Sequence, residues 1–322
     1  MHVDSRLKAV AAIASLAGLL IAFTVGGTAG SAGAATLPNC QVAKNIEGII
    51  DDSGSMSAND SENYRADLLE ALAFFNQDKT MGAVLFGTSA SPLFGPFPVG
   101  PNFAAIKAAL ATVDSNGGGT DYDDGFALAN SHNPNANARI FLSDGEPNST
   151  PDSNLWKNPL IRSYVVGFGT ADFTILNQIA AETGGPAPYS IENASQLRTV
   201  SQVINAAINC EPAPILRESR FNNQGQTRTL GFKPSGTTAE ILISWPTVGN
   251  LFKPIFGGGG AAKGSVAAIA RKRKSAVKVS STRGESYIAL NVKKLTKGTK
   301  FKFKIRAKKL LAPETVTAAI VR

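Results

Sequence analysis

Two largely apolar runs, each closed by a carboxylate, constrain this chain more than any other feature. The first covers residues 44–51 and ends in Asp51, and the second covers residues 138–144 and ends in Asp144. Runs of this length are typical of strands that are buried on both faces, as in a parallel sheet. Because the carboxyl ends of parallel strands meet at one edge, where ligands bind in such sheets, we expect a site there.

Hydroxyl side chains follow the first carboxylate and a later glycine turn. Ser53 and Ser55 follow Asp51 at the spacing D-x-S-x-S, and residues 117–119, all glycine, lead into Thr120. Carboxylate and hydroxyl oxygens are the ligands that hard cations such as Mg²⁺ prefer. In this order the positions resemble the metal-ion-dependent adhesion site of the von Willebrand factor type A domain. The family pattern falls, with none missing, on Asp51, Ser53, Ser55, Thr120 and Asp144.

The resemblance implies a role for each of these side chains. The two serines would ligate the ion directly, the two aspartates would hold coordinated waters, and Thr120 would ligate directly or through water. The ion would be Mg²⁺, with Mn²⁺ or Ca²⁺ as alternatives. Since mostly neutral hydroxyls ligate the ion, it stays electrophilic. Its open position would then take an Asp or Glu carboxylate from a partner protein.

Each fragment also has an ordinary explanation, because Ser, Asp and Gly dominate turns and helix N-caps. Any one of the three fragments alone would fit that explanation. All three together, in the family's order, fit the metal site better. Asp52 departs from the family, in which a neutral residue is common at this position, and it lies either near the ion or toward solvent.

The first residues of the chain predict export. Two basic residues precede an apolar run over residues 9–25, and Ala32 and Ala34 form a small-residue A-x-A cleavage site. This pattern is typical of a secretory signal peptide, here over residues 1–34. An uncleaved membrane anchor stays open as the alternative, because the apolar run is at the short end of what spans a bilayer.

The chain contains two cysteines, Cys40 and Cys210. In an exported protein two cysteines most simply form one disulfide. These two bracket the expected metal-binding domain, whose ends lie close together in the family's fold, so the bond would join its first strand to its last helix. Two unpaired thiols are the alternative.

Strand and helix patterns alternate across residues 37–210, which predicts a doubly wound α/β domain with a mostly parallel sheet. The strands are expected at residues 44–51, 81–88, 138–144, 160–168 and 187–191. The helices are expected at residues 60–76, 101–113, 122–131, 171–183 and 194–209. The Pro-rich stretch 91–98 is expected at a sheet edge or in a hairpin, because proline donates no ladder hydrogen bond.

The second half of the chain differs in charge and in pattern. Residues 35–210 carry 8 basic and 18 acidic residues, whereas residues 211–322 carry 22 and 5. Short alternating runs, such as residues 300–306 with their phenylalanines and lysines, predict half-buried strands. We expect a small antiparallel β-sandwich over residues 221–322, joined to the first domain by a stiff linker at residues 211–220.

A basic cluster adds to the cationic face of the strand expected at residues 300–306. It consists of Arg271, Lys272, Arg273 and Lys274. On an exported protein this surface would meet an anionic envelope polymer, lipid headgroups or an acidic protein. A solvated face that only maintains solubility is the alternative. Nucleic acid is disfavoured as a partner, because export is expected and few aromatic residues lie among the basic ones.

The sequence lacks the common motifs of enzymes. It has no G-x-S-x-G elbow, no H-E-x-x-H pair and no phosphate-binding glycine loop. Outside the signal segment the one histidine is His132, expected in a surface loop. We therefore expect a secreted or envelope-associated, non-enzymatic binding or adhesion protein that captures a carboxylate-bearing ligand through a divalent cation. The alternatives are a membrane-anchored assembly module, and a domain whose ion only stabilises its loops.

Overall fold

The computed structural model describes residues 40–247, 249–256, 278–283 and 287–321. The expected signal segment and the basic cluster at residues 271–274 lie outside these ranges. The first domain contains the strands β1 (Asn45–Asp51), β2 (Thr80–Phe86), β3 (Ala90–Pro98), β4 (Ala138–Ser143), β5 (Arg162–Phe168) and β6 (Tyr189–Ile191). Its helices are α1 (Met56–Asn59), α2 (Tyr64–Phe75), α3 (Val99–Leu110), α4 (Tyr122–His132), η1 (Ser153–Leu155), α5 (Phe173–Glu182) and α6 (Ala194–Ile208).

These strands form one sheet with the order β3-β2-β1-β4-β5-β6. β1 pairs in parallel with β2 on one side and with β4 on the other. The switch point of the sheet therefore lies between β1 and β4, whose carboxyl ends lead to Asp51 and Asp144. The Pro-rich strand β3 runs antiparallel to β2 at the edge, which confirms the expectation for residues 91–98.

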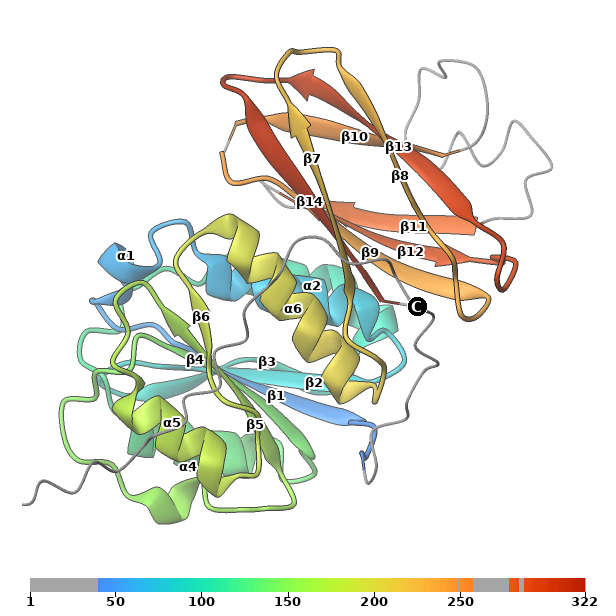
Figure 1. Cartoon of the computed structure of the whole chain (residues 1–322). Coiled ribbons are helices and arrows are strands. Elements are labelled where there is room, and N and C mark those ends of the chain that lie inside the picture. Colours follow the sequence, from blue (N-terminus) through green and yellow to red (C-terminus); the bar gives the residue numbers. More distant parts are fainter. Residues whose placement is uncertain (1–39, 248, 257–277, 284–286, 322) are drawn as a thin grey trace, which may run out of the picture. The chain divides into compact units, whose positions relative to one another are not determined.

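Helices cover both faces of this sheet (Figure 1). α2, α3 and α6 pack on the face that includes Ile46 and Ile50, and α4 and α5 pack on the face that includes Ile49. Since successive side chains of a strand point to opposite faces, both must be apolar in a sheet covered on both sides. This explains the apolar runs in the sequence, and the doubly wound α/β fold is confirmed.

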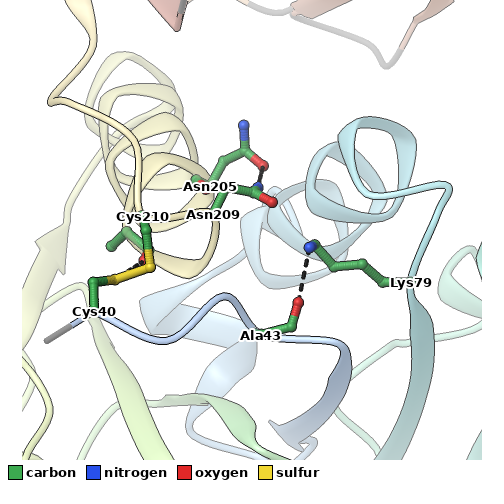
Figure 2. Close-up of a disulfide and its surroundings, with 7 residues drawn as sticks. Cys40, Ala43, Lys79, Asn205, Asn209 and Cys210 are labelled. Carbon is green, nitrogen blue, oxygen red and sulfur yellow. Dashed lines mark hydrogen bonds between the residues drawn. A yellow bond between two sulfur atoms is a disulfide. The ribbon is translucent and has the colours of Figure 1, made fainter. Parts of the chain in front are cut away.

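A disulfide and a group of polar contacts join the ends of the domain (Figure 2). Cys40 and Cys210 form the expected disulfide, with Cα atoms 5.7 Å apart. The amide of Ala43 donates to the carbonyl of Ile208 at 2.8 Å, and Lys79 Nζ donates to the carbonyl of Ala43 at 2.8 Å. The segment before β1 is thus fastened to the carboxyl end of α6.

The second domain is all-β. Its strands are β7 (Ile215–Phe221), β8 (Thr227–Phe232), β9 (Thr238–Ser244), β10 (Leu251–Phe256), β11 (Lys278–Arg283), β12 (Tyr287–Lys293), β13 (Phe301–Lys309) and β14 (Glu314–Val321). They form a sheet with the order β11-β12-β9-β14-β7 and another with the order β10-β13-β8. Both sheets are antiparallel and contribute to one apolar core, in which Ile243 and Ile305 are fully buried.

Strand β13 shows the alternation that the sequence predicted. Phe303, Ile305 and Ala307 are buried, whereas the basic residues between them are exposed. The start of the domain differs from the expected one. β7 begins at Ile215, inside the range 211–220 predicted as a linker, so the connection after Cys210 is shorter than expected. Among the residues described, no helix is long and apolar enough to cross a membrane.

Candidate metal centre

Asp51 ends β1 as a fully buried carboxylate with a fixed orientation. Its Oδ1 accepts a hydrogen bond from the amide of Ser53 at 2.9 Å, and its Oδ2 accepts one from Ser143 Oγ at 2.5 Å. Because Ser143 has a single hydroxyl proton, its oxygen must accept from the Tyr122 hydroxyl, 2.7 Å away. Burial raises the pKa of Asp51 to about 6, against the lowering effect of the bonds from Ser143 and Ser53.

Ser53 and Ser55 present their hydroxyls side by side. Their Oγ atoms lie 3.1 Å apart, with Ser53 buried and Ser55 exposed. Ser55 is the N-cap residue of α1, but its side chain makes no capping hydrogen bond. The helix-cap explanation for this serine is therefore wrong, and its hydroxyl stays available at the surface.

The loop that carries Thr120 is bonded to the loop that follows β1. Gly117 donates to the carbonyl of Asp52 at 2.7 Å, and Gly54 donates to the carbonyl of Gly118 at 2.9 Å. The approach requires glycine, because a Cβ at position 117 would lie 2.8 Å from the Asp52 carbonyl oxygen. Thr120 itself is buried at this junction.

Asp144 lies just beyond β4 and has one satisfied and one unsatisfied carboxylate oxygen. Oδ2 accepts a hydrogen bond from Asn59 Nδ2 at 3.0 Å. Oδ1 is buried and has no hydrogen-bond partner among the described residues. A buried carboxylate oxygen without a donor is costly and marks a position that an ion or a bound water would satisfy.

The donor set that these loops assemble fits a hard cation. It offers two carboxylates and three hydroxyls, and no nitrogen or sulfur ligand. Within the described part of the chain, no three His, Cys, Asp or Glu side chains gather as a metal-binding group. A cation here would therefore depend on hydroxyl ligands, as the sequence pattern suggests.

Asp52 does not supply a further ligand. Its Oδ1 lies 3.6 Å from Arg65 Nη2 and accepts a 3.3 Å hydrogen bond from the amide of Asp114. Arg65 is fully buried and also bonds Asp60. The carboxylate that departs from the family pattern is thus turned toward an internal cation and stabilises the loops behind the site.

Sequence reasoning missed four residues that position the expected ligands. They are Asn59, Tyr122, Ser143 and Asn148. None belongs to the D-x-S-x-S pattern, and each acts through a contact between segments that are distant in sequence. Ser143 alone had a local signal, since it directly precedes Asp144 at the end of β4.

His132 does not lie in a loop, and that expectation is corrected. It is the last residue of α4, and its Nδ1 lies 2.8 Å from Oε1 of the buried Glu47. Glu47 is near the amino end of β1, four residues before Asp51. His132 therefore pairs with a buried carboxylate near the amino end of β1, whereas the candidate metal centre lies beyond the carboxyl end of this strand.

The segments at this edge of the sheet form an acidic rim. They cover residues 52–63, 87–89, 114–121, 145–152 and 169–172. None of them contains Lys, Arg or His. Their exposed carboxylates are Glu62, Asp114, Glu146, Asp152 and Asp172. A ligand of this face must therefore approach through a field that repels anions unless cationic groups surround its carboxylate.

Comparisons with solved structures give matches of low sequence identity. An aerotolerance-related membrane protein from Bacteroides fragilis has 17% identity and a TM-score of 0.45, with 52% of this chain and 98% of that chain covered. A von Willebrand factor type A protein from Catenulispora acidiphila has 13% identity and a TM-score of 0.45, with 85% and 62% covered. The proximal thread matrix protein 1 from the mussel byssus, in a form whose metal-ion-dependent adhesion site (MIDAS) motif is occupied by zinc, has 19% identity and a TM-score of 0.41, with 55% and 50% covered.

No curated protein matches the chain. A family model does match its first domain. The model describes the von Willebrand factor type A domain and covers residues 45–203, from β1 into α6. The strand order, the helices on both faces and the order of the loops agree with this match. Residues 45–203 therefore form a von Willebrand factor type A domain.

Proposed function

We propose that this protein is an exported, non-enzymatic binding protein that captures a carboxylate-bearing protein ligand through a divalent cation. The unsatisfied Oδ1 of Asp144, together with the paired hydroxyls of Ser53 and Ser55, supports this function. A bound cation would supply an electrophilic position for an anionic oxygen. Mg²⁺ fits best, because the donors are all oxygens and include few carboxylates, with Mn²⁺ or Ca²⁺ as alternatives.

Each of the five residues has a distinct part in this proposal. The hydroxyls of Ser53, Ser55 and Thr120 would contact the ion, and the carboxylates of Asp51 and Asp144 would hold its waters. Asp51 is already oriented by Ser143 and by the amide of Ser53. The disulfide between Cys40 and Cys210 supports export, because disulfides persist in oxidising compartments.

The first test removes one hydroxyl and preserves its surroundings. Ser53→Ala keeps the amide that donates to Asp51 and deletes only Oγ, so the fold should persist while Mg²⁺ affinity falls at least about tenfold. Isothermal titration calorimetry measures the affinity. Ser57→Ala is the matched control, because Ser57 bonds the carbonyl of Gly54 and lies outside the proposed ligand set. Equal Mg²⁺ affinity of wild type and Ser53→Ala would contradict the proposal.

A second surface would meet an anionic cell-envelope polymer. The exposed face of β13 carries Lys302, Lys304, Arg306 and Lys308. Alternate residues of a strand are about 7 Å apart, so these cations form a row that suits a linear polyanion. The expected binding needs no divalent ion and weakens as salt rises. If binding to purified envelope polymer is unaffected by salt, or by Lys302→Gln and Lys304→Gln together, the row only maintains solubility.

A further inference from the structure

The second domain offers one exposed carboxylate in basic surroundings. Among its described residues from Ile215 to Val321, the acidic residues are Glu218, Glu240 and Glu314. Glu240 is mostly buried and accepts a hydrogen bond from Asn205, and the buried Glu314 accepts one from Asn250 at 3.1 Å. Glu218 is exposed, and no hydrogen bond or ion pair engages it within the described structure.

Glu218 lies on a strand that is accessible from the side. β7 pairs only with β14, so it forms an edge of its sheet in the described structure. The exposed Arg220 lies on the same face of this strand as Glu218, and the exposed Arg217 lies next to Glu218 on the opposite face. Because both faces are accessible at an edge strand, a partner that approaches β7 meets a single carboxylate close to two cations.

This surface complements the face that contains the metal centre. The acidic rim has no Lys, Arg or His, whereas the described part of the second domain carries 16 Lys and Arg against 3 Glu. A carboxylate ligand flanked by cations could pass the rim and reach the ion, whereas a purely anionic ligand would be repelled. In this chain Glu218 is an exposed carboxylate with such surroundings.

The position of Glu218 favours a neighbouring molecule over its own metal centre. The disulfide and the bond from Ala43 to Ile208 attach the start of the second domain near the amino end of β1. Asp51 is at the opposite end of this seven-residue strand, about 20 Å away. β7 begins only five residues after Cys210, close to that attachment and away from the metal centre.

We propose that a second copy of this chain is a ligand of the metal centre, with Glu218 of one molecule occupying the open position of the cation held by the next. This inference rests on the proposed function and names a partner for the same site. The surface around Glu218 and the surface around the metal centre are different, so the contact between two molecules is heterologous. Such contacts repeat from molecule to molecule and produce open chains unless the rotation closes a ring.

The test uses sedimentation velocity of the full chain at low salt. Wild type should sediment as a concentration-dependent series of oligomers in Mg²⁺ and as a monomer in EDTA. Glu218→Gln, an exposed isosteric change, should weaken the association by about 30-fold or more while Mg²⁺ affinity stays unchanged. Asp78→Asn, an exposed carboxylate at the other end of the sheet from the metal centre, is the control and should associate as wild type does.

A mixing experiment separates the two surfaces. The mixing is done at an Mg²⁺ concentration that loads wild type but leaves Ser53→Ala largely without metal. Under this condition Ser53→Ala keeps Glu218 without a bound cation, whereas Glu218→Gln keeps the loaded metal centre. Each variant should be monomeric alone. An equimolar mixture in Mg²⁺ should stop at a dimer, because Glu218 of the Ser53→Ala molecule can bind the metal centre of the Glu218→Gln molecule and no further intact pair of surfaces remains. Oligomers that survive Glu218→Gln, or a mixture that stays monomeric, would overturn the inference.

The proposed function and this inference fail in different ways. If wild type binds Mg²⁺ and a synthetic peptide with Glu between two Arg residues, but stays monomeric, the self-association is wrong and carboxylate capture stands. If wild type binds no divalent cation, both proposals fall.

Discussion

Asn148 holds both main-chain groups of Thr120. Its side-chain Oδ1 accepts a hydrogen bond from the main-chain amide of Thr120, and its main-chain amide donates to the carbonyl of Thr120 at 3.0 Å. Asn148 belongs to the loop that follows β4, four residues after Asp144. The two bonds therefore fix the threonine loop against the loop that carries the second carboxylate, although the two segments are separated in sequence.

Asn148→Ala removes the bond to the amide of Thr120 and should weaken Mg²⁺ binding. Loss of a residue that orients a ligand typically costs 10- to 100-fold in metal affinity, and we expect about tenfold here because one main-chain bond persists. Calorimetric titration with Mg²⁺ measures the change. Ser149→Ala, at the exposed neighbouring position, should bind as wild type does. An Asn148→Ala protein with wild-type affinity would show that the threonine loop needs no such support.

The proposed ligand set rests on a pattern in the sequence, whereas the residues that support it could not be predicted. Asp51, Ser53 and Ser55 lie within five residues, so their spacing identifies them. Asn148 and Asn59 act only because folding brings the loop after β4 to Thr120 and the end of α1 to Asp144. No local pattern distinguishes these asparagines from ordinary turn residues.

The same limit applies to the second domain. Strand β13 was predictable because its alternation is strict, with apolar residues inward and lysines outward. β7 lies partly in the range predicted as a linker, because two prolines directly precede it and its own residues show little apolar pattern. Its strand conformation depends on pairing with β14, which sequence reasoning did not identify.

Gly145→Ala should destabilise the domain and displace Asp144. Gly145 has a φ of +82°, and a Cβ there would lie 2.1 Å from the carbonyl oxygen of Asp172. We expect a loss of more than about 1 kcal/mol in the free energy of unfolding, together with weaker Mg²⁺ binding. Urea unfolding followed by circular dichroism gives the free energy.

Gly236→Ala is the matched control for this change. A Cβ at Gly236 meets no atom within 4 Å, and its φ is not in the left-handed region. Its stability should stay within about 0.5 kcal/mol of wild type. Equal stability of the two alanine variants would mean that the loop after β4 adapts without cost.

Loss of the disulfide should destabilise the protein without altering its proposed metal ligands. Cys40 and Cys210 are 170 residues apart, so the bond restricts a long loop of the unfolded chain. The expected cost of replacing both by serine is between about 2 and 5 kcal/mol in the free energy of unfolding. Guanidinium unfolding of wild type should show the same loss of unfolding free energy when a reducing agent is added. The double variant should show no response to the reducing agent, and a response would indicate another cause.

Glu47→Gln should reduce the pH dependence of stability. Glu47 is fully buried, and burial raises its pKa to about 7, although the hydrogen bond and charge of His132 act to lower it. The unfolded value is near 4.5. Between these two values the folded protein retains a proton that the unfolded chain releases, so stability falls as pH rises and the loss is complete above about pH 7.

Glutamine stays neutral across this window, so the variant should lose less stability than wild type between pH 5 and pH 8. Between pH 5 and pH 8 the free energy of unfolding should fall by less in the variant than in wild type, by at most about 3 kcal/mol. Urea unfolding at the two pH values measures it. Some slope should remain, because burial also raises the pKa of Glu240 to about 7. Glu192→Gln, at an exposed carboxylate, should keep the wild-type slope. If Glu47→Gln keeps it as well, Glu47 does not link folding to pH.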